Sequence, residues 1–441
     1  MPPCALHQVL TILVQLSIPI LKRSTACRFG RMTGLPYRLP DIDRAGGRGQ
    51  VCHKIWGQVM DELTARQVLD RLVSFPTVSS DSNLALVDWL EGYLAGHGIE
   101  CHRHWNEDGQ KAALMAHAGP RVAGAVVLSG HSDVVPVAGQ DWATDPWVVV
   151  ERDGRLYGRG TCDMKGYVAL AVWALVRGQR MGLTRPLQLA LSYDEEVGCT
   201  GAPPMIAAMQ GVLPVGAVAL IGEPSNMAVI AGHKTGTGYK VHVRGFEVHS
   251  SLLPDGISAV MEAARLIQWV NDRNDRLMRD AGPSPFYPPF STMHVGVISG
   301  GTANNITAGD CQFVVEMRML PGEDVAALAG EFASYAMGLD GDLKARHEGA
   351  GVTLTQFFGV PGLVPEVGGA AEGLARRLTG ANAVGVVSYG TEAGQFQQAG
   401  YSAVICGPGD IAQAHQVNEY LEVAEFAAGQ RFMERLLEEL A

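Results

Sequence analysis

The chain has 441 residues, of which 47% are hydrophobic and 18% are charged, and its formal net charge at pH 7 is −11. This length exceeds what a single hydrophobic core usually holds, so we expect two domains. The acidic balance and the lack of clustered lysine and arginine argue against nucleic acid or a membrane as the main partner.

The first 59 residues differ from the rest of the chain. Residues 9–21 are mostly apolar, but this stretch is too short to span a bilayer and follows no basic segment. Residues 24–58 show no periodicity, and a helical pattern begins abruptly after Met60. We therefore expect residues 1–59 to be a leader that is disordered or is not translated in the natural protein.

The eight cysteines are scattered, and none forms a Cys-x-x-Cys pair. This spacing gives no support for a zinc knuckle or a redox dithiol. A reducing cytoplasm is the simplest compartment for such a chain.

Residues 60–235 alternate between helical and strand patterns. Short continuous apolar runs are typical of strands buried on both faces, and a small-residue helix separates two of them. This rhythm predicts an α/β fold with a mostly parallel sheet flanked by helices. The predicted helices cover residues 63–75, 83–94 and 164–178, and the predicted strands cover residues 125–128 and 187–191.

Residues 236–350 follow a different pattern, in which strands alternate polar and apolar side chains. Two helices among such strands predict a split βαβ, ferredoxin-like domain inserted into the first domain. The parallel-sheet pattern resumes after Phe357, and we expect residues 351–441 to complete the first domain. The predicted helices cover residues 258–278, 323–337, 371–378 and 422–440, and the predicted strands cover residues 236–244, 294–298, 311–319 and 403–406.

Five side chains that can bind metal ions lie where predicted strands end or in the loops that follow. Each one alone is more often an ordinary loop or capping residue. Together they place nitrogen and oxygen donors at one rim of an α/β sheet, enough for two divalent cations that share a carboxylate. This mixed donor set suits zinc or cobalt better than magnesium. The five residues are His131, Asp163, Glu196, Glu223 and His415.

Two further carboxylates stand beside these candidates. Asp133 lies two residues after His131, so both side chains leave the same face of an extended segment and the carboxylate can orient the ring. Glu195 precedes Glu196, and adjacent side chains of a strand point to opposite sides. Glu196 can then bind metal while Glu195 takes a proton from a water molecule. An exposed acidic turn is the alternative for this pair.

These motifs resemble the co-catalytic zinc aminoacylase and carboxypeptidase family, from about residue 63 to the C-terminus. Other hydrolase motifs, such as Gly-x-Ser-x-Gly and His-Glu-x-x-His, are missing from the sequence. The resemblance implies a zinc-peptidase-like fold and a two-metal amidohydrolase that acts on an N-acyl amino acid. The segments that carry it are residues 128–137, 139–142, 156–161, 163–166, 192–199 and 390–394.

The resemblance also assigns metal ligands. It implies that His131, Asp163 and Glu223 hold one zinc or cobalt ion. It implies that Asp163, Glu196 and His415 hold the second. Asp133 would orient His131.

The resemblance implies a catalytic and a conformational role as well. Glu195 would be the general base and later the proton donor to the leaving amine. The peptide bond between Asp163 and Met164 is expected to be cis.

The inserted domain, residues 236–350, would be a lid and a homodimer interface. The resemblance implies that His249 reaches the active site of the partner subunit and stabilises the oxyanion there. It implies that Asn305 and Arg318 bind the carboxylate of the substrate, the arginine through a bidentate fork.

We therefore expect a cytoplasmic homodimeric enzyme that deacetylates an N-acetyl amino acid, with N2-acetyl-L-ornithine as the expected substrate. Another deacylase or dipeptidase of the same family, acting on an N-acyl-citrulline or a succinyl amine, is the first alternative. A catalytically silent, dimeric binding protein is the alternative from a different class.

Overall fold

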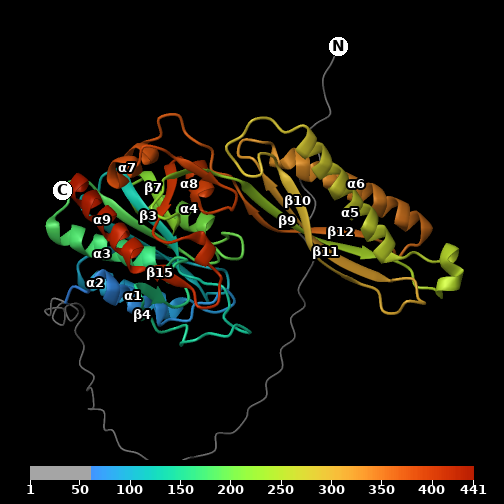
Figure 1. Ribbon diagram of the computed structural model, residues 1–441, viewed down its shortest axis with the longest axis horizontal. Coiled ribbons are helices and arrows are strands. Elements are labelled where there is room, and N and C mark those ends of the chain that lie inside the picture. The colour runs from blue at the N-terminus through green and yellow to red at the C-terminus, as the bar shows by residue number, and fades with distance from the viewer. Residues whose placement is uncertain (1–60) are drawn as a thin grey trace, which may run out of the picture. The chain divides into compact units, whose positions relative to one another are not determined.

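The computed structural model describes residues 61–441 (Figure 1), so the prediction for residues 1–59 lies outside the described residues. Its largest sheet has eight strands in the order β1-β2-β6-β3-β7-β14-β8-β13. Strand β3 pairs in parallel with β6 and β7, and β7 pairs in parallel with β14. The strands are β1 Glu100–Trp105, β2 Ala112–Ala118, β3 Ala125–His131, β6 Leu187–Ser192, β7 Gly216–Pro224, β8 Ile230–His233, β13 Gly385–Val387 and β14 Ser402–Gly407.

The predicted α/β class is therefore confirmed. The sheet is mixed, because β1 and β2 add an antiparallel edge that the sequence did not predict, and β8 also pairs with β14 in antiparallel fashion. Strand β1 is only partly buried along its length, so its residues carry no strong apolar pattern.

Helices cover both faces of this sheet. Successive side chains of a strand point to opposite faces, so Leu128 packs into one core while Val127 packs into the other. Helix α3 is buried along most of its length, as its run of alanine, valine and leucine predicts. The first face is covered by α1 Ala65–Val73, α2 Leu84–Gly96, α3 Lys165–Met181, α7 Ala370–Thr379 and α9 Val423–Leu440, and the second by α4 Ala202–Val212 and α8 Ala393–Gln398.

A smaller antiparallel sheet has the strand order β10-β11-β9-β12. Two long helices pack on it and form a separate core with it (Figure 1). The sequence placed the end of the inserted domain at residue 350, but β12 pairs with β9 throughout, so the observed sheet extends to Val360. Its elements are β9 Thr235–Arg244, α5 Ala259–Arg279, β10 Thr292–Gly300, β11 Asp310–Met319, α6 Val325–Arg346 and β12 Gly351–Val360.

A third sheet joins two segments that are far apart in the chain. It contains β4 (Val150–Arg152), β5 (Arg155–Tyr157) and β15 (Tyr420–Glu422), in the order β15-β5-β4. Its strands lead into the loop of Asp163 on one side and follow the loop of His415 on the other. Over residues 61–441, none of the helices combines the length and the apolar character needed to cross a bilayer.

Candidate metal centre

The predicted ligands come from neighbouring strand ends and from two loops. His131 is the last residue of β3, and Glu223 lies near the end of the adjacent β7. Glu195 and Glu196 follow β6, the neighbour of β3 on its other side. Because these strands are parallel, their carboxyl ends meet at one edge of the sheet.

Asp163 and His415 approach this edge from the two loops. Asp163 lies directly before α3, and its peptide bond to Met164 is cis, as the resemblance implied. Nearby, a Cβ atom on Gly166 would collide with the carbonyl oxygen of Thr161, so the start of α3 requires glycine there.

The five ligand candidates form one cluster. Asp163 contacts both imidazoles, with Oδ1 at 3.1 Å from His131 Nε2 and Oδ2 at 3.3 Å from His415 Nε2. His415 Nε2 also lies 2.8 Å from Glu196 Oε2. On the other side, His131 Nε2 lies 3.8 Å from Glu223 Oε1. Asp163 therefore occupies the central position between the two histidines.

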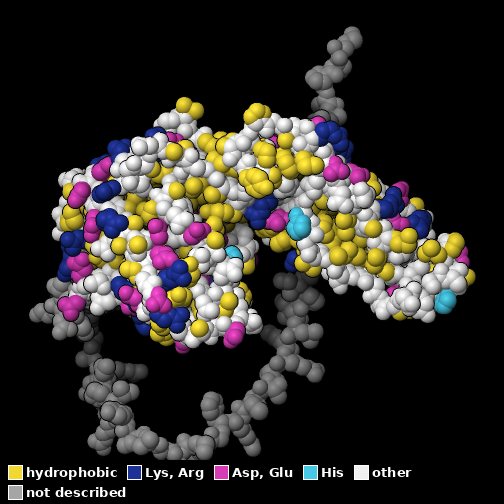
Figure 2. Space-filling model, in the orientation of Figure 1, with side chains coloured by type: hydrophobic (Ala, Val, Ile, Leu, Met, Phe, Trp, Pro, Cys, Tyr) yellow, Lys and Arg dark blue, Asp and Glu magenta, His cyan; other side chains and the backbone are white. Residues whose placement is uncertain are grey.

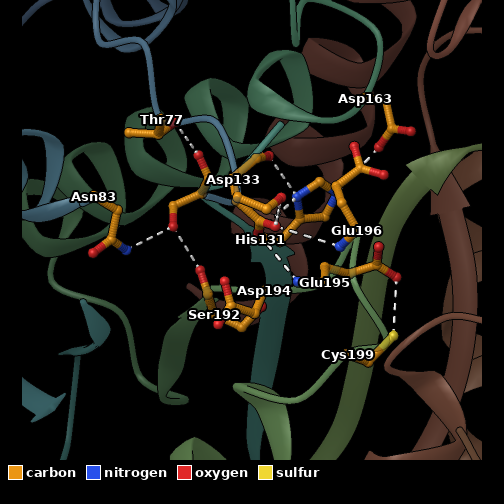
Figure 3. A network of polar contacts seen from close by, with 12 residues as sticks. Thr77, Asn83, His131, Asp133, Asp163, Ser192, Asp194, Glu195, Glu196 and Cys199 are labelled. Atoms are coloured by element: carbon orange, nitrogen blue, oxygen red, sulfur yellow. Dashed lines mark hydrogen bonds and ion pairs between the residues drawn. The ribbon is translucent and has the colours of Figure 1, made fainter. Parts of the chain in front are cut away.

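Asp133 supports both His131 and the turn of the two glutamates (Figure 3). The ring of His131 approaches the backbone carbonyl of Asp133 with Nδ1 at 2.9 Å, and the Asp133 carboxylate at 3.5 Å. That carboxylate instead accepts hydrogen bonds from the backbone N–H groups of Glu195 (3.2 Å) and Glu196 (3.3 Å) and from the hydroxyl of Ser79 (2.7 Å). With Nδ1 donating to the carbonyl, Nε2 is free to act as a ligand.

The cluster concentrates negative charge in a buried place. Burial raises the pKa of Glu195 to about 8 and that of Glu196 to about 7, and it raises the pKa of Glu223 well above its ordinary value. Burial also acts to raise the pKa of Asp163, but hydrogen bonds from His131 and His415 outweigh it and hold that pKa below its usual range.

The residues present fit bound cations. In the described part of the chain, Glu196 Oε1 and Glu223 Oε1 are buried and have no hydrogen-bond partner. Burying an unpaired carboxylate oxygen costs free energy of folding unless a nearby positive charge compensates it. Two sets of three ligand atoms lie within 4.8 Å of one another: one from His131, Asp163 and Glu196, the other from His131, Glu195 and Glu223. The second set includes Glu195, to which the resemblance gave the role of base.

A cavity of about 660 Å³ opens beside the cluster. The acidic residues form one wall, and the smaller sheet contributes cationic and aromatic side chains to the other. Arg318, predicted to bind a substrate carboxylate, lies on this second wall, and its guanidinium also pairs with Glu316 at 2.5 Å. The residues of the second wall include Lys240, Arg318, Phe357, Phe358 and Val360.

His249 and Asn305 lie elsewhere. Both are exposed, and neither lines the cavity. They are close to each other, because the N–H of Ser250 donates to the carbonyl of Asn305 at 2.8 Å and His249 forms a β-bridge with Ile306. One chain therefore does not bring these two side chains to the cluster, and their roles stay predictions.

Several supporting residues were not predicted. The thiol of Cys199 contacts Glu195 Oε1 at 3.1 Å, and Figure 3 shows this contact at the end of the turn. Arg159 and Glu419 form a buried ion pair beside the Asp163 loop. The positions of this pair in the sequence offer a hint, since Arg159 stands four residues before Asp163 and Glu419 four residues after His415.

Comparison with known proteins agrees with the resemblance in the motifs. Residues 127–439 match the peptidase family M20/M25/M40. An acetylornithine deacetylase from Myxococcus xanthus is 35% identical over 372 residues, which cover 82% of this chain and 93% of that protein. An acetylornithine deacetylase from Proteus mirabilis is 31% identical over 379 residues, which cover 83% and 94%.

Solved structures share the fold at low sequence identity. The M20 family metallo-carboxypeptidase Sso-CP2 from Sulfolobus solfataricus matches with a TM-score of 0.68 and 15% identity, covering 86% of this chain and 99% of that chain. The YXEP protein from Bacillus subtilis, a dinuclear metal-binding peptidase, matches with a TM-score of 0.59 and 16% identity, covering 85% and 97%.

Proposed function

Because the chain belongs to the peptidase family M20/M25/M40 and is a metal-dependent hydrolase, we propose that it converts N2-acetyl-L-ornithine to L-ornithine and acetate in arginine biosynthesis. The observation that carries the proposal is the cluster of carboxylates and imidazoles at the wall of a substrate-sized cavity. The relatives named above favour this substrate. The five cysteines in the described part of the chain are all free, which suits a reducing cytoplasm.

The cluster is proposed to hold two divalent cations, zinc or cobalt. Bound there, they would polarise the amide carbonyl and acidify the attacking water. His131, Asp163 and Glu223 would hold one, and Asp163, Glu196 and His415 the other. The contacts of Asp163 with both imidazoles suit the shared position.

Glu195 is the proposed general base. It takes a proton from the attacking water and passes it to the leaving amine. Burial raises the pKa of its carboxyl to about 8, and bound cations would bring that pKa down again, because nearby positive charge favours the carboxylate. The thiol of Cys199 holds one oxygen of this carboxyl, so that the other can face the substrate.

The smaller sheet is proposed to bind the substrate and a second subunit. Arg318 would hold the substrate carboxylate together with Asn305. His249 would reach the partner subunit's cavity, a role that suits its exposed place outside the cavity of its own chain.

An uncovered edge of that sheet supports a homodimer. Strand β10 lies at this edge, and its Val297 and Ile298 are 66% and 51% exposed. Figure 2 shows hydrophobic side chains gathered over the region of the smaller sheet. An exposed edge strand with apolar side chains favours pairing with another chain.

A direct assay tests the proposed reaction. Zinc-loaded protein should release ornithine from N2-acetyl-L-ornithine with a higher kcat/KM than it shows for N-acetyl-leucine or an N-succinyl amine. A higher kcat/KM for either competitor would overturn the substrate. If the zinc-loaded dimer hydrolyses none of these three compounds, the result would favour the catalytically silent binding protein.

One observation favours a second candidate, a deacylase for another N-acyl amino acid. Among the described residues that line the cavity, the carboxylates all belong to the acidic cluster, whereas Lys240 and Arg318 are cationic. A cationic ornithine side chain would find no separate acidic partner there, while an anionic or apolar side chain would meet Lys240 or the two phenylalanines. Replacing Lys240 with glutamate should then raise kcat/KM for acetylornithine relative to the succinyl amine.

A further inference from the structure

Arg159 and Glu419 form an ion pair that is buried almost completely. Arg159 Nη1 lies 2.6 Å from Glu419 Oε2, and each side chain is 1% exposed. Burying two charges costs free energy that the attraction between them does not always return. The position of this pair beside the cluster suggests what it contributes.

Glu419 fixes the backbone at Asp163. Its second oxygen, Oε1, accepts hydrogen bonds from the N–H groups of Cys162 at 2.9 Å and Asp163 at 3.1 Å. Its backbone carbonyl accepts a further bond from the N–H of Gly158 at 3.0 Å. Glu419, in the loop of His415, therefore holds both ends of the Asp163 loop, residues 158–163.

Arg159 makes the reverse connection, to the loop of His415. Its Nη2 donates to Gln140 Oε1 at 2.7 Å, and Gln140 Nε2 donates to the carbonyl of His415 at 3.2 Å. Its Nη1 also reaches the carbonyl of Gln416 at 3.4 Å.

The His415 loop needs such external support. His415 and Asn418 have φ values of 64° and 57°, in the left-handed region that residues with a side chain rarely adopt. A backbone in this region persists where its surroundings hold it.

We propose that Arg159 and Glu419 are positioning residues, whose ion pair holds the loops of Asp163 and His415 together and so sets the affinity for the cation that these two ligands share. The inference rests on the proposed roles of Asp163 and His415. Replacing partners that orient metal ligands typically weakens metal binding about 10- to 100-fold.

The principal test is Glu419→Gln. The amide keeps the size of the side chain and can still accept the two N–H bonds, but it leaves the guanidinium of Arg159 without a counter-charge. We expect zinc affinity, measured on the folded protein by competition with a chromophoric chelator, to fall about 10- to 100-fold. We also expect kcat to fall more than KM rises, because the ligands and not the substrate contacts are displaced.

Glu422→Gln is the matched control. Glu422 pairs with Arg155 at 2.9 Å, and this pair joins β5 to β15 close to Arg159 and Glu419 in the sequence, but its two side chains are 43% and 41% exposed. We expect its zinc affinity and kcat to equal those of the wild type. Thermal unfolding of both metal-free variants separates lost stability from lost affinity.

The outcomes distinguish the inference from the proposed function. If Glu419→Gln binds zinc as tightly as Glu422→Gln, the positioning role is wrong. If Glu419→Gln does not fold, Arg159→Lys replaces it, since lysine lacks the fork of two nitrogens with which the guanidinium binds Glu419 and Gln140. Wild-type zinc affinity in that variant would equally overturn the inference. Asp163→Asn tests the ligand itself: unchanged zinc binding there would refute the proposed metal ligands, whatever Glu419→Gln does.

Discussion

The two main sheets are covered to different degrees. In the large sheet, β3 and β6 are buried at every position, with helices on both faces. In the smaller sheet, α5 and α6 form one core with the strands, while most residues of β10 are exposed. The large sheet therefore holds its ligand cluster within one chain. The loops of the smaller sheet instead carry side chains, such as His249, whose proposed targets lie on another chain. Four predictions test this division.

The largest expected effect lies on the large sheet. Glu195→Gln should lower kcat about 10²- to 10⁴-fold, the range that a general base contributes, because the amide cannot accept a proton. Zinc content, measured by mass spectrometry, should stay that of the wild type. The exposed Glu434→Gln serves as control. A loss of zinc together with activity would instead make Glu195 a ligand, as its place near His131 and Glu223 allows.

The next effect tests the smaller sheet. Replacing Val297 and Ile298 together with aspartate should yield monomers in light scattering, because charges would stand on an interface proposed to be apolar. If His249 acts on the partner, kcat should fall roughly 10²-fold, as for the loss of an oxyanion donor. The control is Val122→Asp, which lies outside the smaller sheet at a valine that is 53% exposed; this variant should stay dimeric and active. A fully active monomer would show that the smaller sheet contributes nothing to the cavity of a partner subunit.

Metal removal should have a smaller effect, on stability. Zinc at about 100 times its dissociation constant should stabilise the protein by roughly 2.7 kcal/mol, because it binds the folded chain. At a pH that ionises Glu223 in spite of its raised pKa, Glu223→Gln removes one buried charge, so the metal-free variant should melt at a higher temperature than the metal-free wild type, and zinc should shift it less. Calorimetry measures both. If the metal-free Glu223→Gln variant melts at the same temperature as the metal-free wild type, repulsion among the buried carboxylates does not destabilise the fold.

The smallest expected effect concerns Cys199. Cys199→Ala removes the contact with Glu195 Oε1, and a typical hydrogen bond is worth about 1 kcal/mol, so kcat should fall several-fold. Cys199→Ser keeps a donor and should restore most of the rate with unchanged KM. Equal rates for the two variants would show that the thiol fills space and does not orient the base.

The sequence predicts some elements and site residues better than others. His131 and Glu223 could be predicted as site residues because they end apolar runs that become adjacent parallel strands. The small-residue pattern of residues 164–178 likewise predicted a helix, which is α3. In each case the physical cause is local, because the same side chains that pack the element into the core form the pattern that predicts it.

What the sequence did not predict depends on distant partners. Arg159 and Glu419 each stand four residues from a predicted ligand, but 260 residues separate the two, so the sequence does not show that they pair. The strand β12 alternates polar and apolar residues, but its membership in the smaller sheet follows from pairing with β9. The positions of His249 and Asn305 relative to a cavity depend on a second chain, so a single sequence offers only the resemblance.

The small sheet of β4, β5 and β15 has a consequence for biosynthesis on the ribosome. A nascent chain that has emerged only as far as β12 already carries His131, Asp163 and the three glutamates, but neither His415 nor Glu419. Such an intermediate lacks one candidate ligand and the anchor of the Asp163 loop. With His415 and Glu419 in their proposed roles, full assembly of the centre requires β15, and a polypeptide interrupted before that strand should bind zinc weakly and lack activity.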